Sequence, residues 1–365
     1  PVEPGWTLIR TIETTGPMAA HFNPRDGRIY FGKRGSGADG LYRVDDYGFS
    51  ERLAAGSNAA GVVVQPDSGH VFLSEDYGGV IYRTGFGGTG RATWVSGFRV
   101  NRDEDPVGMA FAPANYTGSV LRPGDALSVD RGNNGYDDVW CWSPLVAQGE
   151  YLVHPDDGTL TDPVDIHISP THVYIADSGA TTGGIYILAA DSTLTQLPTA
   201  VPLVHPEGVA GDPLTGDLLV MERGLGRLVR IDPGTGAVNE VVTGLTTSYV
   251  YWAGVDISPD GRRLFLTDHD AGAIYVFARC DATGLPEIDC DGNNVYDLCD
   301  VTLGGATDCN HNGVPDDCDL SSGTSEDCDL DGRPDDCPVC GPVEVVFVMD
   351  TSTSMNDEAA ALCSN

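Results

Sequence analysis

The sequence is short of positive charge and of long apolar runs. Its 365 residues carry 20 Lys and Arg against 54 Asp and Glu, a formal net charge of −34, and Lys33 is the only lysine. Binding of nucleic acid needs clustered cations, so this balance excludes nucleic acid as a partner. No run of 18 apolar residues occurs, so no membrane span is predicted.

Helix-forming patterns are scarce as well, and the only good one covers residues 356–363. The 47 glycines and 23 prolines instead indicate the many turns of an all-β chain. Residue 1 is Pro1 rather than Met. We expect that export removed a leader or that the sequence starts within a longer protein.

A repeated unit fills residues 1–279. Each copy has a short apolar strand, a turn of Pro, Asp and Gly, a second strand, a polar loop and an aromatic-rich third strand, as in AGVDISPDGRRLFLTDHDAGAIYVF. Six such units predict a six-bladed β-propeller, whereas the alternative, a β-sandwich, needs no such repetition. The turn prolines, 42 to 57 residues apart, are Pro24, Pro66, Pro113, Pro170, Pro213 and Pro259.

A fourth strand follows most units, as at residues 93–95 and 238–242, but the sixth unit runs into Cys280 without one. We expect residues 6–12 to supply that strand, because closing the ring removes free sheet edges. The longest step between turn prolines, 57 residues, predicts an inserted loop around residues 115–125 in the third blade.

Strings such as PVGMAFAP and ISPTHVYIADSG resemble NHL-type, gluconolactonase-like and sugar-dehydrogenase-like propellers over residues 6–279. Residues that follow the second strands should gather at one mouth of the channel, where they could hold a metal, as in calcium-dependent lactonases. They are Glu75, Asp76, Asp130, Arg131, Asp177, Glu222, Arg223, Asp268, His269 and Asp270, with His21, His167 and His269 as conceivable bases.

The alternative for these carboxylates is architectural: they close turns and pair with arginine. Repetition in blade after blade favours this alternative, and the sequence has no nucleophile elbow, phosphate loop or zinc-type cluster. A single metal held in the channel by two or more of the carboxylates would favour an enzyme.

Residues 280–340 differ from the propeller in composition. They contain 16 acidic residues, the single cation Arg333 and eight of the ten cysteines. So many cysteines indicate an oxidising compartment, which places the protein outside the cell or at the cell surface. Carboxylates at this density repel one another unless counter-ions neutralise them.

Three loops recur here with a period of 19 residues. Oxygen-bearing side chains stand at loop positions 1, 3, 5 and 9, position 6 is Asn294, Gly313 or Gly332, and the carbonyl at position 7 would add a ligand. Position 12 is Asp300 in the first loop, Asp319 in the second and Pro338 in the third. Because the third loop lacks this last carboxylate, we expect it to bind an ion more weakly. The expected ligands are Asp289, Asp291, Asn293, Asp297 and Asp300, then Asp308, Asn310, Asn312, Asp316 and Asp319, then Asp327, Asp329, Asp331 and Asp335.

The pattern resembles thrombospondin type 3 and dockerin repeats, and the resemblance implies about three Ca²⁺ sites. A disordered acidic linker is the alternative, but periodic cysteines do not follow from disorder. The cysteines are spaced 10 and 9 residues apart in turn, which favours pairing of neighbours. The pairs would be 280–290, 299–309 and 318–328, or the set shifted by one; the sequence leaves the choice open.

Residues 341–365 form a third segment. The apolar run 345–349 followed by Asp350, Ser352 and Ser354 resembles the opening of a von Willebrand factor A domain, whose metal-ion-dependent adhesion site begins with these residue types. The resemblance implies a divalent-ion site, incomplete within this chain. We expect the apolar strand to pair within a further domain or with a second chain by strand addition, giving self-assembly.

Two functions fit these features. We favour a non-catalytic, secreted calcium-binding scaffold or adhesion protein, such as a subunit of an extracellular fibre, with other protein chains or surface glycans as partners. The alternative is a secreted propeller enzyme of the lactonase or sugar dehydrogenase type, with the calcium loops serving as its attachment module.

Overall fold

The computed structural model describes most of the propeller and most of the cysteine-rich segment. The described residues are 5–35, 37, 39–44, 50–56, 59–75, 79–86, 90–96, 106–131, 138–143, 149–153, 158–179, 183–247, 254–281, 283, 289–310, 312–328, 330 and 332–337. The expected strand 345–349, the helix 356–363 and the residues Asp350, Ser352 and Ser354 lie outside them.

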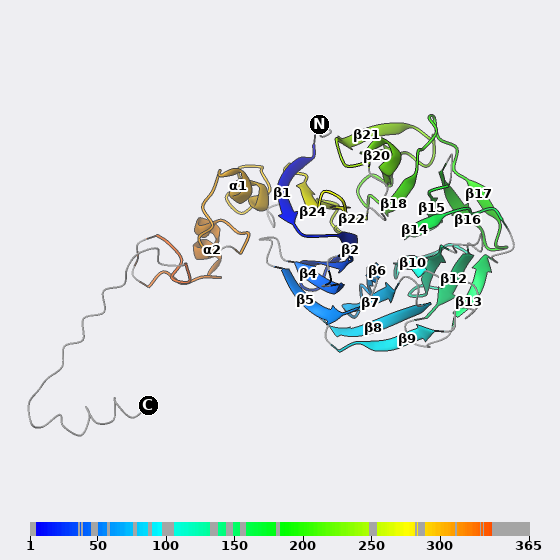
Figure 1. The fold of residues 1–365 in the computed structure, drawn as a ribbon. Coiled ribbons are helices and arrows are strands. Elements are labelled where there is room, and N and C mark those ends of the chain that lie inside the picture. Colours follow the sequence, from blue (N-terminus) through cyan, green and yellow to red (C-terminus); the bar gives the residue numbers. More distant parts are fainter. Residues whose placement is uncertain are drawn as a thin grey trace, which may run out of the picture.

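Six four-stranded antiparallel sheets stand around a central axis as the blades of a propeller (Figure 1), as the repeats predicted. Blade 1 contains β2 (Pro17–Asn23), β3 (Arg28–Lys33), β4 (Gly40–Val44) and β5 (Ser50–Ala55). Blade 2 contains β6 (Ala59–Val64), β7 (His70–Glu75), β8 (Val80–Phe86) and β9 (Ala92–Ser96). Blade 3 contains β10 (Pro106–Phe111), β11 (Ala126–Asp130), β12 (Asp138–Trp142) and β13 (Gly149–Val153).

The remaining blades repeat this order. Blade 4 contains β14 (Pro163–Ile168), β15 (Val173–Asp177), β16 (Gly184–Leu188) and β17 (Leu194–Gln196). Blade 5 contains β18 (Pro206–Gly211), β19 (Leu218–Glu222), β20 (Arg227–Ile231) and β21 (Val238–Thr243), with the 3-10 turn η1 (Arg223–Leu225). Blade 6 contains β22 (Val255–Ile257), β23 (Arg263–Asp268), β24 (Ala273–Ala278) and β1 (Thr7–Glu13).

The ring is closed by the N-terminal strand, as expected from residues 6–12. β1 pairs antiparallel with β24, from Thr7 opposite Ala278 to Glu13 opposite Ala273. Beside it, the Arg279 guanidinium lies 4.3 Å from the Trp6 ring centroid and bonds Asp212 of blade 5. Both ends of the propeller sequence therefore meet in one blade, and no edge of β24 stays open to pair with another chain.

The first strand of each blade lines the channel, and the middle strands pack against neighbouring blades. Because both faces of the middle strands are covered, strands such as β15 and β19 are buried along their whole length rather than alternating. Aromatic rings fill the wedges between blades: the Phe72 centroid lies 5.1 Å from that of Trp142 and 5.4 Å from that of Phe111. Apolar packing at these wedges holds the blades in a ring.

The propeller has two distinct faces. The turn face carries the turns between first and second strands, where the six prolines lie. The loop face is opposite, where second strands end and the connections into each blade arrive. The expected insertion in blade 3 is present: the connection from β10 to β11 covers residues 112–125 on the turn face.

Two short helices follow the propeller, α1 (Asp297–Leu303) and α2 (Asp316–Ser322), and they correct the expectation that helix is confined to the C-terminal tail. Each has only seven residues and begins at position 9 of a loop, so no amphipathic period is long enough to reveal it. Acidic residues in the first turn favour both helices through the helix dipole. Neither helix, in the part of the chain that the structure describes, is long and apolar enough to cross a bilayer.

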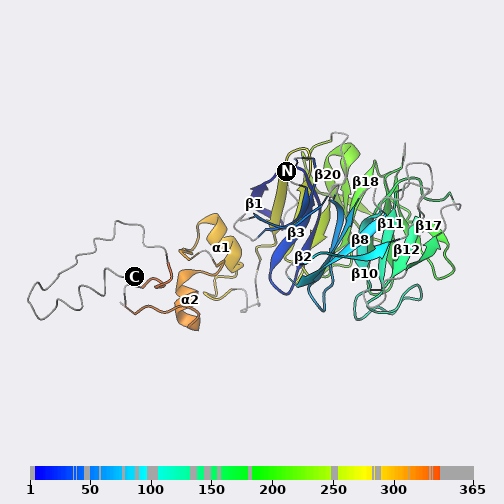
Figure 2. The same ribbon diagram turned by 60° about the horizontal axis from the view of Figure 1, so that its bottom comes forward.

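The cysteine-rich segment lies outside the ring beside β1 (Figures 1 and 2), and α1 packs against that strand. Asp281 forms a β-bridge with Val295, and the Arg262 guanidinium donates to the Asp281 carbonyl oxygen. A disulfide joins Cys280, two residues after β24, to Cys299 in α1. The segment is thus fastened to the blade that closes the propeller.

The disulfides do not join neighbouring cysteines, so the expected pairing was wrong. Cys280 pairs with Cys299, Cys290 with Cys318 and Cys309 with Cys337, at Cα separations of 5.8, 5.9 and 5.1 Å. In the first two loops the cysteine at position 2, Cys290 or Cys309, bonds the one at position 11 of the following repeat rather than that of its own repeat. This pairing follows from how consecutive repeats stack, which sequence spacing does not reveal.

Candidate metal centre

The carboxylate at position 1 shapes each of the three loops in the same way. Its oxygen accepts the N–H of position 6, from Asn294 to Asp289 at 2.9 Å, from Gly313 to Asp308 at 2.9 Å and from Gly332 to Asp327 at 3.0 Å. Position 6 has φ of +66° in Asn294 and +84° in the two glycines. Asparagine tolerates this left-handed conformation, so the replacement of Gly in the first loop leaves the sharp turn intact.

Positions 3, 5 and 7 continue the pattern. In the first loop the Asn293 N–H donates to the Asp291 carboxylate at 3.0 Å, and the Val295 N–H donates to the Asn293 oxygen at 2.7 Å. In the second loop the N–H groups of Asn312 and Val314 donate in the same register, at 3.1 and 2.8 Å. These bonds between residues two apart turn the side-chain oxygens toward the middle of each loop.

Positions 9 and 12 close the loops from the helices. Oδ1 of Asp297 accepts the Cys290 N–H at 3.1 Å, and Oδ1 of Asp316 accepts the Cys309 N–H at 2.8 Å. The position 12 carboxylates reach back to position 5: the Asn293 amide donates to Asp300 at 2.6 Å, as the Asn312 amide does to Asp319 at 2.7 Å. In the first and second loops the five expected side chains are therefore linked to one another around the loop.

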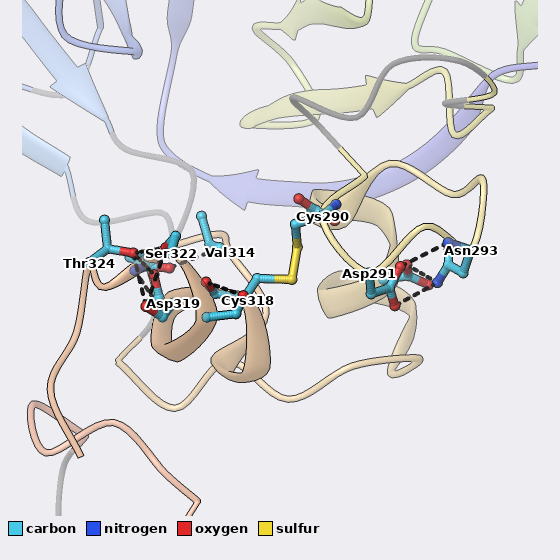
Figure 3. The surroundings of a disulfide bond; sticks show 12 residues. Cys290, Asp291, Asn293, Val314, Cys318, Asp319, Ser322 and Thr324 are labelled. Carbon is cyan, nitrogen blue, oxygen red and sulfur yellow. Dashed lines mark hydrogen bonds between the residues drawn. A yellow bond between two sulfur atoms is a disulfide. The ribbon is translucent and has the colours of Figure 1, made fainter. Parts of the chain in front are cut away.

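Figure 3 shows how the loops are tied together. The Cys290–Cys318 disulfide joins the first loop to α2, with Asp291 and Asn293 on one side of it and Asp319 on the other. Asp319 Oδ1 also accepts the Thr324 hydroxyl at 3.0 Å. Covalent bonds thus hold two candidate centres next to each other in a segment with almost no apolar core.

The carboxylates of the first loop have the features of an ion site. Asp289, Asp297 and Asp300 are buried, and Asp289 Oδ1 has no hydrogen-bond partner although it is inaccessible. Oxygens of Asp289, Asp291 and Asp297 lie within 4.8 Å of one another. Burial raises the pKa of Asp297, and the Asp291, Asp289 and Asp300 carboxylates raise it further against the bond from Cys290. A bound cation would satisfy the orphan oxygen and remove this repulsion.

The third loop is more exposed. Asp327 and Asp335 keep their bonds to Gly332 and to the Cys328 N–H, but Asp335 is exposed where Asp297 and Asp316 are buried. Asp329, Asp331 and Pro338 lie outside the described residues. Weaker ion binding by this loop stays a prediction.

Carboxylates at the channel mouth have another role. Each ends a second strand, is buried, and accepts backbone N–H groups of the connection that enters its own blade: Asp162 to Asp177 at 2.7 Å, Val204 to Glu222 at 2.7 Å and Thr246 to Asp268 at 3.0 Å. They fasten loops in blade after blade, which supports the architectural alternative.

The other residues predicted at the mouth are also engaged in pairs. Glu75 accepts Arg91 at 2.8 Å, Arg131 pairs with Asp162 and Arg223 with Glu207. His269 lies 3.1 Å from Asp270, and Asp130 is buried. Asp76 lies outside the described residues. In the described part of the chain, the side-chain groups close enough to hold one ion all belong to the loops from Asp289 onward.

We call the half of the channel nearer the turn face the lower channel. It contains a cluster of polar side chains that the sequence only partly revealed. A cavity of about 210 Å³ is lined by first-strand residues, among them His21, Asp165, His167 and Asp256. The sequence indicated His21 and His167 as conceivable bases but did not indicate Asp165 and Asp256. The available signal was a charged residue inside an otherwise apolar strand, in VDIHI and VDI.

Two titratable groups of this cluster, Asp165 and His167, should have opposite effects on how stability depends on pH. Burial raises the pKa of Asp165 from 3.8 to about 7, so its contribution to stability is lost as the pH rises from about 4 to 7. Burial and the nearby His21 lower the pKa of His167 from 6.5 to about 4, so its contribution is lost as the pH falls through that range.

We therefore expect Asp165→Asn to make the free energy of unfolding rise with pH between about 4.5 and 6.5 relative to the parent, and His167→Gln to make it fall. Each difference should be of order 3 kcal/mol across the window. Urea unfolding at several pH values measures both slopes. Because the calcium loops are unchanged, they cancel in the comparison, and parallel curves for the three proteins would contradict the assignment.

Comparison with known proteins supports the fold. No protein-family model and no curated protein matches the sequence. Among solved structures, a gluconolactonase from Xanthomonas campestris has a TM-score of 0.56 at 14% identity, with 75% of this chain and 88% of that chain covered. The calcium-binding protein regucalcin from Agrobacterium tumefaciens has a TM-score of 0.54 at 14% identity, covering 74% and 92%.

A chain of a nidogen–laminin complex is similar at a TM-score of 0.55 and 16% identity, covering 68% of this chain and 88% of that one. These neighbours differ widely in what their names describe, although their backbones agree. At such identities, the likeness shows a six-bladed propeller and does not extend to function.

Proposed function

We propose that this chain is a secreted calcium-binding scaffold in which the propeller presents a binding face and residues 280–340 form a connector held by ions. The observation that carries the proposal is the shared geometry of the loops, with the orphan oxygen of Asp289 in the first. Carboxylate and amide oxygens at positions 1, 3, 5, 9 and 12 would hold Ca²⁺. The ions act by neutralising buried charge, so each binding event stabilises the fold.

Three disulfides support export to an oxidising environment. The mouth carboxylates support a non-catalytic propeller, because their oxygens are taken up by loop backbone and arginines. On this proposal residues 341–365 lead into an adhesion or assembly module, in which Asp350, Ser352 and Ser354 begin a divalent-ion site. Self-assembly through the strand at 345–349 belongs to the same proposal.

The enzyme alternative rests on the lower channel. His21 Nδ1 lies 3.5 Å from Asp256, an arrangement that could move a proton, and one structural neighbour is named a gluconolactonase. Hydrolysis of glucono-lactone that is abolished by His21→Gln would favour this alternative over the scaffold.

Calcium titration tests the proposal directly. By isothermal titration calorimetry we expect about three Ca²⁺ ions per chain, with the third weaker, and the loss of one ion in each of Asp289→Asn and Asp308→Asn. Asp317→Asn is the matched control, because Asp317 is exposed beside the second loop and stands at no ligand position. Absence of saturable binding up to about millimolar Ca²⁺, the range of extracellular sites, would refute the proposal.

A further inference from the structure

The channel of the propeller contains a cavity on its turn-face side. Toward the loop face the apolar side chains of Met18, Ala60, Val107 and Val164 are buried together. Beside them, first strands approach so closely that a Cβ on Gly61 would collide with the Val107 carbonyl oxygen, and one on Gly108 with the Asp165 backbone. On the turn-face side of these residues, the cavity of about 210 Å³ has room for about seven waters.

A groove on the turn face adjoins this cavity. It has a volume of about 940 Å³, and His167, Ile168 and Gly211 belong to the walls of both spaces. Its lining includes the rings of His172 and Tyr174, whose centroids are 5.9 Å apart. The prolines of four turns and of the blade 3 insertion complete the wall: Pro113, Pro170, Pro213, Pro233 and Pro259.

Two acidic side chains line the cavity, and each accepts a backbone N–H from a neighbouring first strand. Asp165 Oδ2 accepts the Val209 N–H at 2.9 Å, and Asp256 Oδ2 accepts the Phe22 N–H at 2.7 Å. Among the described residues, no arginine or lysine pairs with either carboxylate, and His21 is the single ionisable partner, of Asp256. Burial raises the pKa of Asp165, and the nearby Asp256 carboxylate raises it further.

Carboxylates that have no arginine or lysine partner are costly to keep ionised in a partly enclosed cavity, and a bound cation would lower that cost. Asp165 lies on β14 and Asp256 on β22, in different blades, so only folding brings the two carboxylates to one cavity. Unlike the carboxylates of the channel mouth, they are not needed to hold connecting loops in place. The chain as a whole has a net charge of −34, which draws cations toward it.

We propose that the lower channel binds an organic cation, a guanidinium or primary ammonium group that enters from the turn-face groove and lies between Asp165 and Asp256. His167, neutral at the junction of the two spaces, offers a ring nitrogen as a further acceptor. The wall of proline and aromatic rings receives the apolar stem or flanking residues of the ligand. This site is separate from the calcium loops and needs no reaction.

The cation has two sources, a free amine or a basic side chain of an extended peptide, and two probes distinguish them. One is n-butylguanidinium and the other is the peptide acetyl-Pro-Pro-Arg-Pro-Pro-amide. We expect saturable binding of both by calorimetry with the calcium-loaded full chain at about pH 8, above the pKa of about 7 of Asp165. Tighter binding of the peptide identifies a protein partner, and equal affinities identify a small amine; either supports the site.

Variants make the test specific. Asp165→Asn and Asp256→Asn should each weaken binding at least about 10-fold, because each removes one buried charge partner. Glu51→Gln is the matched control: Glu51 is 62% exposed on outer strand β5, so its variant makes the same charge change outside the channel and should bind like the parent. The peptide with Gln in place of Arg should not bind.

Lowering the pH tests the site without a mutation. The titratable residues that line the cavity are His21, Asp165, His167 and Asp256. Protonation of any of them reduces attraction for a cation, so binding should weaken at least about 10-fold between about pH 8 and 5.5. No saturable binding of either probe, or equal weakening by Glu51→Gln and Asp165→Asn, would overturn the proposal.

Discussion

In excess EGTA, the amides of α1 and α2 are expected to lose at least about 100-fold of their protection from hydrogen exchange, while those of β15 and β19 keep theirs. Seven-residue helices are not stable by themselves, and their burial in this segment involves Leu298, Cys299 and Cys318 with four carboxylates. Without ions those carboxylates are buried next to one another, so the loops open.

Hydrogen exchange followed by mass spectrometry separates this effect from a general one, because β15 and β19 lie in blades far from the loops. The disulfides stay intact, so the opened segment remains tethered to blade 6. An Asp289→Asn variant should show the loss around α1 without chelator, whereas Asp317→Asn should not. Unchanged protection of both helices in EGTA would mean that disulfides alone hold the segment, and the calcium proposal would fail.

Deletion of residues 1–13 is expected to lower the melting temperature by about 10 °C or more and to make the protein associate. The deletion removes buried Trp6 and Ile12, each worth about 2–5 kcal/mol in large-to-small replacements. It also exposes the backbone edge of β24 along Ala273–Ala278, where another chain can pair. Calorimetry gives the melting temperature, and sedimentation gives the association state.

Point variants locate the effect within the closing strand. Ile12→Ala should cost about 2–4 kcal/mol, because its side chain is 4% exposed. Leu8→Ala, on the same strand with 43% of the side chain exposed, should change stability by about 0.5 kcal/mol or less. The deletion also removes β1, the strand on which α1 packs, whereas Cys280 stays attached to β24. Removal of calcium by EGTA should therefore destabilise the deletion variant no more than it destabilises the parent. A deletion variant that melts like the parent would show that the ring does not depend on this closure.

The propeller could be predicted because its signals are local. Apolar strands, turn residues and the missing fourth strand of the sixth unit recur along the chain, so the number of blades and the closure by residues 6–12 followed directly. The loop positions followed in the same way, down to the left-handed Asn294. Helices α1 and α2 escaped because seven residues contain too little of a helical period.

The channel cluster and the disulfides could not be read in this way. Asp165 and Asp256 are 91 residues apart and line one cavity only because the ring brings the first strands of blades 4 and 6 together around it. Cys290 has Cys299 and Cys280 nearer in sequence, yet it bonds Cys318 because stacking of the repeats places their Cα atoms 5.9 Å apart.

By itself the sequence determined the all-β architecture, the six blades, their closing strand and the three oxygen-rich loops, since each depends on the order of residue types within a few tens of positions. Only the tertiary structure decided which cysteines bond, that the carboxylates of the channel mouth fasten loops, and that His21, Asp165, His167 and Asp256 share a pocket. The physical reason is that a short-range pattern sets the local backbone, whereas partners distant in sequence are chosen by how the closed ring and stacked repeats pack.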